Sequence, residues 1–188
     1  LFYFMPVVTG SVSVGVIWTW IMNGDFGLLN TILGAVGITG PKWLTDPKIV
    51  LFSIVIVSVW WNVGYNMVLL LAGLQNIPEV YYEAAEIDGA NKWKAFRHIT
   101  LPMLSPTLFF VLIMTIISSF QVFDQAYVMT QGGPMKASYT LVYHIYQGAF
   151  VEFRMGGACA ASVILFAIIL AITMIQMYGS KRWVNYEQ

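Results

Sequence analysis

The sequence predicts an all-α membrane protein, a polytopic helix bundle with four transmembrane helices in a single domain, 1–188. The chain is 59% hydrophobic and only 10% charged, whereas soluble domains carry roughly 25% charged residues. Four stretches contain no Asp, Glu, Lys or Arg, namely 1–22, 49–74, 99–123 and 155–178. Each reaches the roughly 20 residues that a helix needs to cross a bilayer core. Because backbone amides in lipid must be paired internally, each stretch is expected to be a helix.

The segments between these stretches differ in character. Residues 23–48 are rich in Gly and carry charge, which predicts a water-exposed loop. The run 130–134, Thr-Gln-Gly-Gly-Pro, predicts a turn, after which Ser138 is expected to cap a short interfacial helix that extends to Phe150. Pro102 and Pro106 in the third stretch predict a helix that starts late or bends.

Charged residues concentrate between the second and third stretches, in 77–98. Pro78 suits a first helical turn, Glu83 suits the positive end of the helix dipole, and Gly89 can supply the left-handed residue that ends a helix. Asn91 can cap a second helical turn in which the basic residues cluster. The pattern predicts a helix-turn-helix that projects beyond the membrane.

The spacing of seven residues in this region resembles the "EAA" loop of the permease subunits of ABC importers. These residues are Glu83, Ala84, Ala85, Gly89, Ile99, Leu101 and Pro102. The words Leu-Ala-Gly-Leu-Gln at 71–75, Ile-Asp-Gly-Ala at 87–90 and Thr-Gln-Gly-Gly-Pro at 130–134 resemble the carbohydrate and glycerol-phosphate branch of those permeases. The alternative from charge pattern alone is an ordinary solvated cytoplasmic loop.

The resemblance implies a function and a set of partners. The chain would be the membrane-spanning subunit of a binding-protein-dependent importer for a sugar or glycerol-phosphate-like solute, multi-pass in a prokaryotic cell membrane. Its partners would be ATPase subunits, a second permease subunit and an extracytoplasmic solute-binding protein. The 77–98 loop would be the cytoplasmic coupling helix that contacts the ATPase, with Asp88 among its contacts. Such permeases usually have two further helices upstream, so an N-terminally incomplete chain is expected.

Several other functions lack the residues they require. No glycine-rich phosphate loop ending in Gly-Lys-Ser/Thr occurs, so the chain is not expected to be an enzyme, and ATP and Mg²⁺ are expected in a partner subunit. The run 10–15 does not match the Gly-x-Ser-x-Gly elbow of a serine hydrolase, and neither His98 nor His144 lies in an apolar stretch. The two histidines make a poor metal site. The zero net charge does not suggest nucleic acid.

Polar residues inside the apolar stretches define a predicted solute pathway. Asn62, Tyr65 and Asn66 share one helical face, and Thr115, Ser118 and Ser119 share another. Hydroxyls and amides beside an aromatic ring suit a hydroxyl-rich solute, although the same groups can bond helices together. In sugar permeases the resemblance places the solute site between these helices, at positions matching Trp61, Asn62, Tyr65, Thr115, Ser118, Ser119 and Val122.

Two alternatives to a sugar importer remain open. The chain could serve an ABC importer for another solute class, such as a polyamine, an amino acid or an ion. It could also be a secondary transporter driven by an ion gradient. A secondary transporter predicts ionisable residues inside the spans, and the four stretches contain no Asp, Glu or His.

Overall fold

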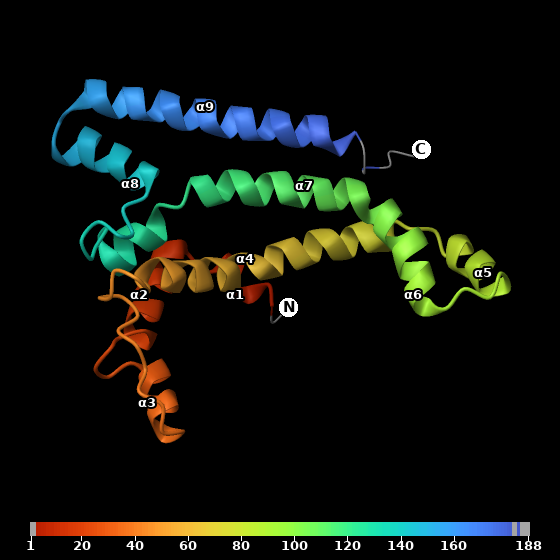
Figure 1. The fold of residues 1–188 in the computed structure, drawn as a ribbon, viewed down its shortest axis with the longest axis horizontal. Helices are drawn as coiled ribbons and strands as arrows, with labels where there is room; N and C mark the ends of the chain where they lie inside the picture. The colour runs from red at the N-terminus through yellow and green to blue at the C-terminus, as the bar shows by residue number, and fades with distance from the viewer. Residues whose placement is uncertain (1–2, 182–183, 185–188) are drawn as a thin grey trace. The chain divides into compact units, whose positions relative to one another are not determined.

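The computed structural model describes residues 3–181 and 184, and within them every regular element is a helix. Three of these helices are long and apolar enough to cross a membrane. They are α4 (Val50–Gln75), the continuous run over 92–120 that ends in α7 (Leu101–Phe120), and α9 (Met155–Ser180) (Figure 1). They confirm the all-α membrane fold and three of the predicted spans. The chain folds into two compact units, residues up to 64 with 120–166, and 65–119 with the residues from 167 onward.

The prediction of one spanning helix over 1–22 is wrong. The structure forms two short helices instead, α1 (Met5–Val8) and α2 (Ser11–Ile21), and residues 1 and 2 lie outside the described part of the chain. Thr9 and Gly10 separate the two helices with extended ψ angles of 135° and 136°. A β-branched residue followed by glycine disfavours helix, which explains why an unbroken apolar run does not give an unbroken helix.

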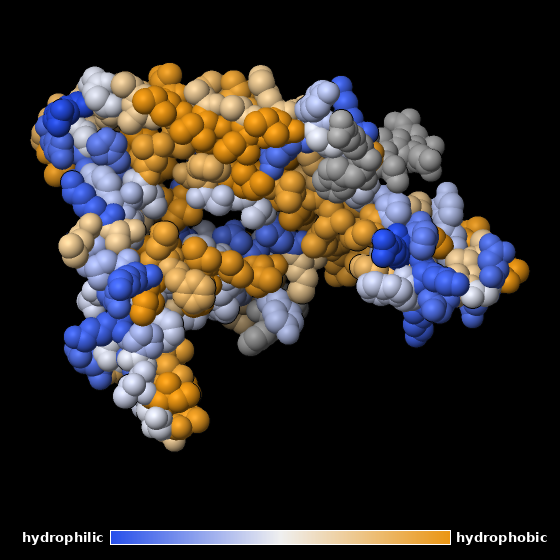
Figure 2. All heavy atoms as spheres, in the orientation of Figure 1, coloured by the Kyte–Doolittle hydropathy of each residue, from blue (hydrophilic) through white to orange (hydrophobic). Residues whose placement is uncertain are grey.

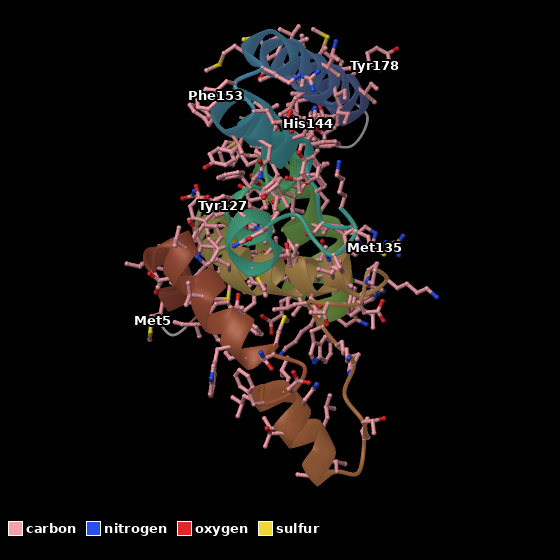
Figure 3. All side chains as sticks on the ribbon, turned by 90° about the vertical axis from the view of Figure 1, so that its left-hand side faces the viewer. Met5, Tyr127, Met135, His144, Phe153 and Tyr178 are labelled. Atoms are coloured by element: carbon pink, nitrogen blue, oxygen red, sulfur yellow. The ribbon has the colours of Figure 1, made fainter. Side chains whose placement is uncertain are left out.

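The first unit has its core where α2 meets the N-terminal half of α4. Val14, Met22, Val57 and Met129 are buried together. The short helix η2 (Ala126–Thr130), which carries Tyr127, packs against α2 (Figure 3). The predicted loop 23–48 contains one helix, α3 (Leu28–Ala35). Asn30 fixes this loop because its amide donates to the carbonyls of Gly24 and Pro41 at 2.8 and 3.2 Å, while Trp43 Nε1 donates to its Oδ1 at 2.8 Å.

The short helix predicted after the 130–134 turn exists, but Ser138 does not cap it. Its two parts are α8 (Leu141–Tyr146) and η3 (Gln147–Val151). Thr140 is the N-cap, accepting from Tyr143 N at 3.2 Å while donating to Val122 O at 2.8 Å. Ser138 is only 1% exposed and donates instead to Gly133 O at 2.6 Å. The Ser138 hydroxyl therefore bonds the turn at Gly133 instead of capping the helix.

In the second unit, α4 and α7 approach closely at Gly73. A Cβ built on Gly73 would lie 2.7 Å from Thr107 Oγ1 and 2.8 Å from Leu104 Cδ1. α7 tolerates Pro106 in its interior because Ser105 Oγ donates to Pro102 O at 2.6 Å. That carbonyl is the one that a residue with an N–H at position 106 would have bonded. Of the two predicted alternatives, a late start is wrong, since the helical run already begins at Lys92, and a bend is present between α6 (Lys92–Ala95) and α7 (Figure 1).

Candidate functional site

The predicted projecting loop forms around α5 (Val80–Ile87), whose C-terminal end is fixed by backbone bonds. Gly89 has φ +72° and donates to Glu86 O at 3.0 Å, and Ala90 N donates to Ala85 O at 2.9 Å. This pair of bonds is a Schellman motif, which needs a left-handed residue at Gly89's position. The conformation predicted for Gly89 is confirmed. Nothing lies within 4 Å of a Cβ built there, so only backbone strain restricts the residue type.

α5 has one bonded face and one exposed face. Tyr82 and Ala85 are half-buried, and the Tyr82 hydroxyl bonds Thr100 Oγ1 at 2.9 Å. The other face exposes Val80, Glu83, Ala84 and Ile87 at i, i+3, i+4 and i+7, with Ile87 87% exposed. Asp88 is also exposed. Among the described residues, none covers this mixed apolar and acidic helix face, which is therefore accessible to a partner.

The second helix of the predicted helix-turn-helix is confirmed as α6, although it is joined to the following membrane-length helix without a loop. α6 (Lys92–Ala95), capped by Asn91 Oδ1 at 2.9 Å from Lys94 N, runs through one π-helical segment, η1 (Phe96–Thr100), directly into α7. Helical geometry is kept from Lys92 to Phe120. The cap at Asn91 was predictable from sequence. The fusion with α7 was not, because Pro102 suggested an interruption.

The remaining matched residues of this region lie on the continuous helix. Ile99 and Pro102 are half-buried, and Leu101 is exposed. Ile99 belongs to η1, and Leu101 and Pro102 form the first turn of α7. Tyr82 was missed by sequence reasoning, although it joins α5 to the residue next to Ile99. In Figure 2, hydrophilic residues gather over α5 and α6, beyond the hydrophobic surface of α7.

The two predicted polar faces meet at one point in the second unit. Asn66 Nδ2 lies 3.5 Å from Thr115 Oγ1, joining α4 and α7. Tyr65 is 41% exposed, and Thr115, Ser118 and Ser119 are exposed. Ser118 donates to Met114 O at 2.8 Å and Ser119 to Ile116 O at 2.8 Å. Each hydroxyl therefore keeps its acceptor lone pairs available for a ligand.

The other predicted pathway residues have structural partners in the first unit. Trp61 Nε1 donates to Pro6 O at 2.8 Å and Asn62 Nδ2 to Ser58 O at 2.9 Å, which leaves Asn62 Oδ1 available. Val122 contributes its carbonyl to Thr140, as described above. The bond from Trp61 shows that this residue also anchors the segment before α2.

The first unit also has a cavity of about 530 Å³ that the sequence did not predict. The end of α2, the loop before α4 and the 128–134 segment line it, with polar side chains from Thr19, Asn23, Thr45, Thr130 and Gln131. Its lining comes from three segments far apart in sequence, so no local pattern marks it. In the same unit, Ser11 Oγ donates to the Asp124 carboxylate, tying α2 to the start of the 124–154 segment.

The described residues do not form a metal site. No group of three or more His, Cys, Asp or Glu that could hold a metal ion occurs among them. Cys159 is a free, exposed thiol at the start of α9.

Comparison with known proteins identifies the family. Residues 1–185 match the model of the family described as "Binding-protein-dependent transport system inner membrane component". The chain is 40% identical to a probable ABC transporter permease protein, YesP, of Bacillus subtilis, covering 100% of this chain and 61% of that protein. It is 36% identical to the arabinooligosaccharides transport system permease protein AraP of the same species, over 93% of this chain and 56% of AraP.

A further curated relative and a solved structure also resemble this chain. The sn-glycerol-3-phosphate transport system permease protein UgpA of Agrobacterium fabrum is 37% identical over 97% of this chain and 62% of UgpA. The fold matches a crystal structure of a bacterial ABC transporter involved in alginate import, with a TM-score of 0.87 and 23% identity over 97% of this chain and 64% of that chain. The chain thus spans about three fifths of the curated relatives it matches. It belongs to the binding-protein-dependent transport system inner membrane components.

Proposed function

We propose that this chain is the membrane-spanning subunit of an ATP-driven importer for a sugar or glycerol-phosphate-like solute. The observation that carries the proposal is the exposed face of α5, which lies in the connection between two membrane-length helices, α4 and the 92–120 run. The names of its relatives support the solute class, since they refer to arabinooligosaccharides and sn-glycerol-3-phosphate. ATP and Mg²⁺ would bind a partner ATPase, and the chain itself would catalyse no reaction.

Coupling would proceed through bonded contacts within the second unit. An ATPase subunit that closes on ATP would move α5 through the exposed residues Glu83, Ala84 and Asp88. The Tyr82–Thr100 bond and the Schellman turn at Gly89 would carry this movement to η1. Because helical geometry is continuous from Lys92 to Phe120, a displacement of η1 would shift α7 as well. The solute would then experience two arrangements of the pathway, whose populations depend on the nucleotide.

The polar side chains of α4 and α7 would line the pathway. Asn62 Oδ1, Tyr65 and the hydroxyls of Thr115, Ser118 and Ser119 offer acceptors and donors in otherwise apolar helices. A sugar hydroxyl can both donate and accept, and an aromatic ring can cover its apolar face. Trp61 would contribute through its ring, because its N–H is already bonded to Pro6. Val122 would contribute an apolar contact.

The experiment is solute-stimulated ATP hydrolysis by the purified complex. The full-length protein would be isolated with its second permease subunit, its ATPase subunits and its extracytoplasmic binding protein, then reconstituted in vesicles. Oligosaccharides, glycerol phosphate, polyamines and amino acids would be compared. We expect stimulation by one carbohydrate or glycerol-phosphate class. Stimulation by a polyamine or an amino acid alone would change the solute class, and uptake without a copurifying ATPase would refute the ATP-driven mechanism.

A further inference from the structure

The basic and aromatic residues that begin the continuous helix over 92–120 form a surface with no assigned role. Lys92, Trp93, Lys94, Phe96 and Arg97 are all exposed, and the Trp93 and Phe96 rings stack with centroids 5.8 Å apart. Lys94 and Arg97 are three residues apart and share one face. Ala95 and Ile99 are half-buried at i and i+4 on the other side of the helix, and the exposed Lys92 lies at the edge of that side.

The cations on this surface have no carboxylate partner within the described chain. The only ion pair among the described residues joins Arg154 and Glu152. The nearby acidic residues lie on and around α5, and none reaches Lys92, Lys94 or Arg97 within 4.0 Å. His98 differs from these three because its ring Nδ1 is bonded to Lys94 O at 3.0 Å. Three side-chain cations are therefore free for an anion outside this chain.

The depth of this surface follows from helix length. The charge-free part of the helix, 99–120, is about 33 Å long at about 1.5 Å per residue. A bilayer hydrocarbon core is about 30 Å thick. When this part spans the core, Arg97 lies at the hydrocarbon boundary, and because α6 turns away from the axis of α7 (Figure 1), Lys94 and Lys92 stay close to that boundary. That is the depth of lipid headgroups, where Trp rings also concentrate.

We propose that Lys92, Lys94 and Arg97 bind the phosphate headgroups of anionic lipids in the cytoplasmic leaflet, with Trp93 and Phe96 seated at the boundary. Guanidinium and ammonium groups suit phosphate oxygens, Arg by paired bonds and Lys as a point charge. The C-terminal end of α9 lies at the same end of the second unit as α6 (Figure 1), and Lys181, the residue after α9, adds a further cation there. Bound lipid would hold η1, and with it the Tyr82–Thr100 bond, at a fixed depth.

Retention of lipid by the full-length permease, purified in its complex, tests the proposal. The complex would be prepared in nanodiscs of equal parts phosphatidylcholine and phosphatidylglycerol, and the lipids kept after mild extraction would be counted by native mass spectrometry. We expect wild type to prefer phosphatidylglycerol. Lys94→Gln and Arg97→Gln should each lower that preference about fivefold, the equivalent of about 1 kcal/mol per basic residue at an anionic surface.

Matched controls separate the possible sources of the anion. Lys48→Gln, an exposed cation in the loop before α4, should leave the preference unchanged, and Arg97→Lys should retain most of it. Unchanged preference in the Lys94→Gln, Arg97→Gln double variant would overturn the proposal. So would loss of the ATPase subunit in both lipids with normal lipid retention, which would assign these cations to the protein interface. Displacement of phosphatidylglycerol by inorganic phosphate would indicate a site for free phosphate instead.

Discussion

The segment 76–100 and the segment 120–154 are both polar connections between apolar helices, but different kinds of contact order them. Local bonds fix the first: the cap at Asn91 and the Schellman turn at Gly89 lie within a few residues of their partners. The second is also held from outside, because Ser11 in α2 bonds Asp124. The bond of Thr140 to Val122, like that of Tyr82 to Thr100 in the first, joins two residues of the same segment. The first segment can therefore be predicted from sequence and move as a unit, whereas the second depends on the rest of its folded unit.

Substitution of Gly89 should have the largest effect on transport. In Gly89→Val, a β-branched residue would have to adopt φ +72°, which costs about 1–2 kcal/mol, and the Schellman turn should open. We expect transport to fall about tenfold at normal membrane abundance. Gly34→Val in α3 is the control, because that position also has open space around its Cβ but lies within a regular helix. Equal transport by the two variants would show that the turn at Gly89 is dispensable.

Ser138→Ala should have the next largest effect, on stability rather than on coupling. The variant would leave the carbonyl of half-buried Gly133 without its bond from the buried Ser138 and would remove the 2.7 Å contact with Thr130 Oγ1. Loss of a partner from a buried polar group costs about 1–3 kcal/mol. Thermal unfolding of the purified full-length protein should therefore begin at a lower temperature. A variant as stable as wild type would mean that the Ser138 hydroxyl does not hold this segment.

Thr140→Ala should destabilise less than Ser138→Ala, because Thr140 is only partly buried. It would lose one N-cap bond, worth about 1 kcal/mol, together with the bond to Val122. Thr140→Ser keeps the hydroxyl and should restore most of the stability. If Thr140→Ala lowered the stability more than Ser138→Ala, the N-cap bond at Thr140 would contribute more to the stability of this segment than the bonds of the buried Ser138.

Tyr82→Phe should have the smallest effect and should act on coupling. It removes only the hydroxyl that bonds Thr100, a bond worth about 0.5–1.5 kcal/mol. We expect normal assembly with the ATPase but fewer solute molecules transported per ATP hydrolysed. Tyr81→Phe, on an exposed neighbour, is the control. If the number of solute molecules transported per ATP is unchanged in both variants, movement of α5 is transmitted to α7 by the polypeptide connection alone, without this hydrogen bond.

The contrast between these segments also explains what the sequence could predict. Apolar length was sufficient to predict α4, α9 and most of the 92–120 helix, since lipid leaves helix as the available backbone structure. Caps and positive-φ glycine are local signals, so Gly89 and Asn91 were identified correctly. The break at Thr9 and Gly10 was missed because apolar length alone was used for 1–22. The cavity near Gln131 depends on residues distant in sequence, which no local pattern specifies. Ser138 was predicted as a helix cap, but its hydroxyl bonds the turn that precedes it.

Cross-linking from the exposed face of α5 tests the central claim most directly. Ala84→Cys in α5 and Ala35→Cys in α3, each in a Cys159→Ser background of the full-length protein, place a single new thiol at exposed positions. In intact cells, a membrane-impermeant thiol reagent should label Ala35→Cys and spare Ala84→Cys. In isolated membranes, a bifunctional reagent should join Ala84→Cys alone to an ATP-hydrolysing subunit, with a yield that changes when ATP binds. Labelling of Ala84→Cys from outside the cell, or no adduct with an ATPase, would contradict the assignment of α5 as the coupling element.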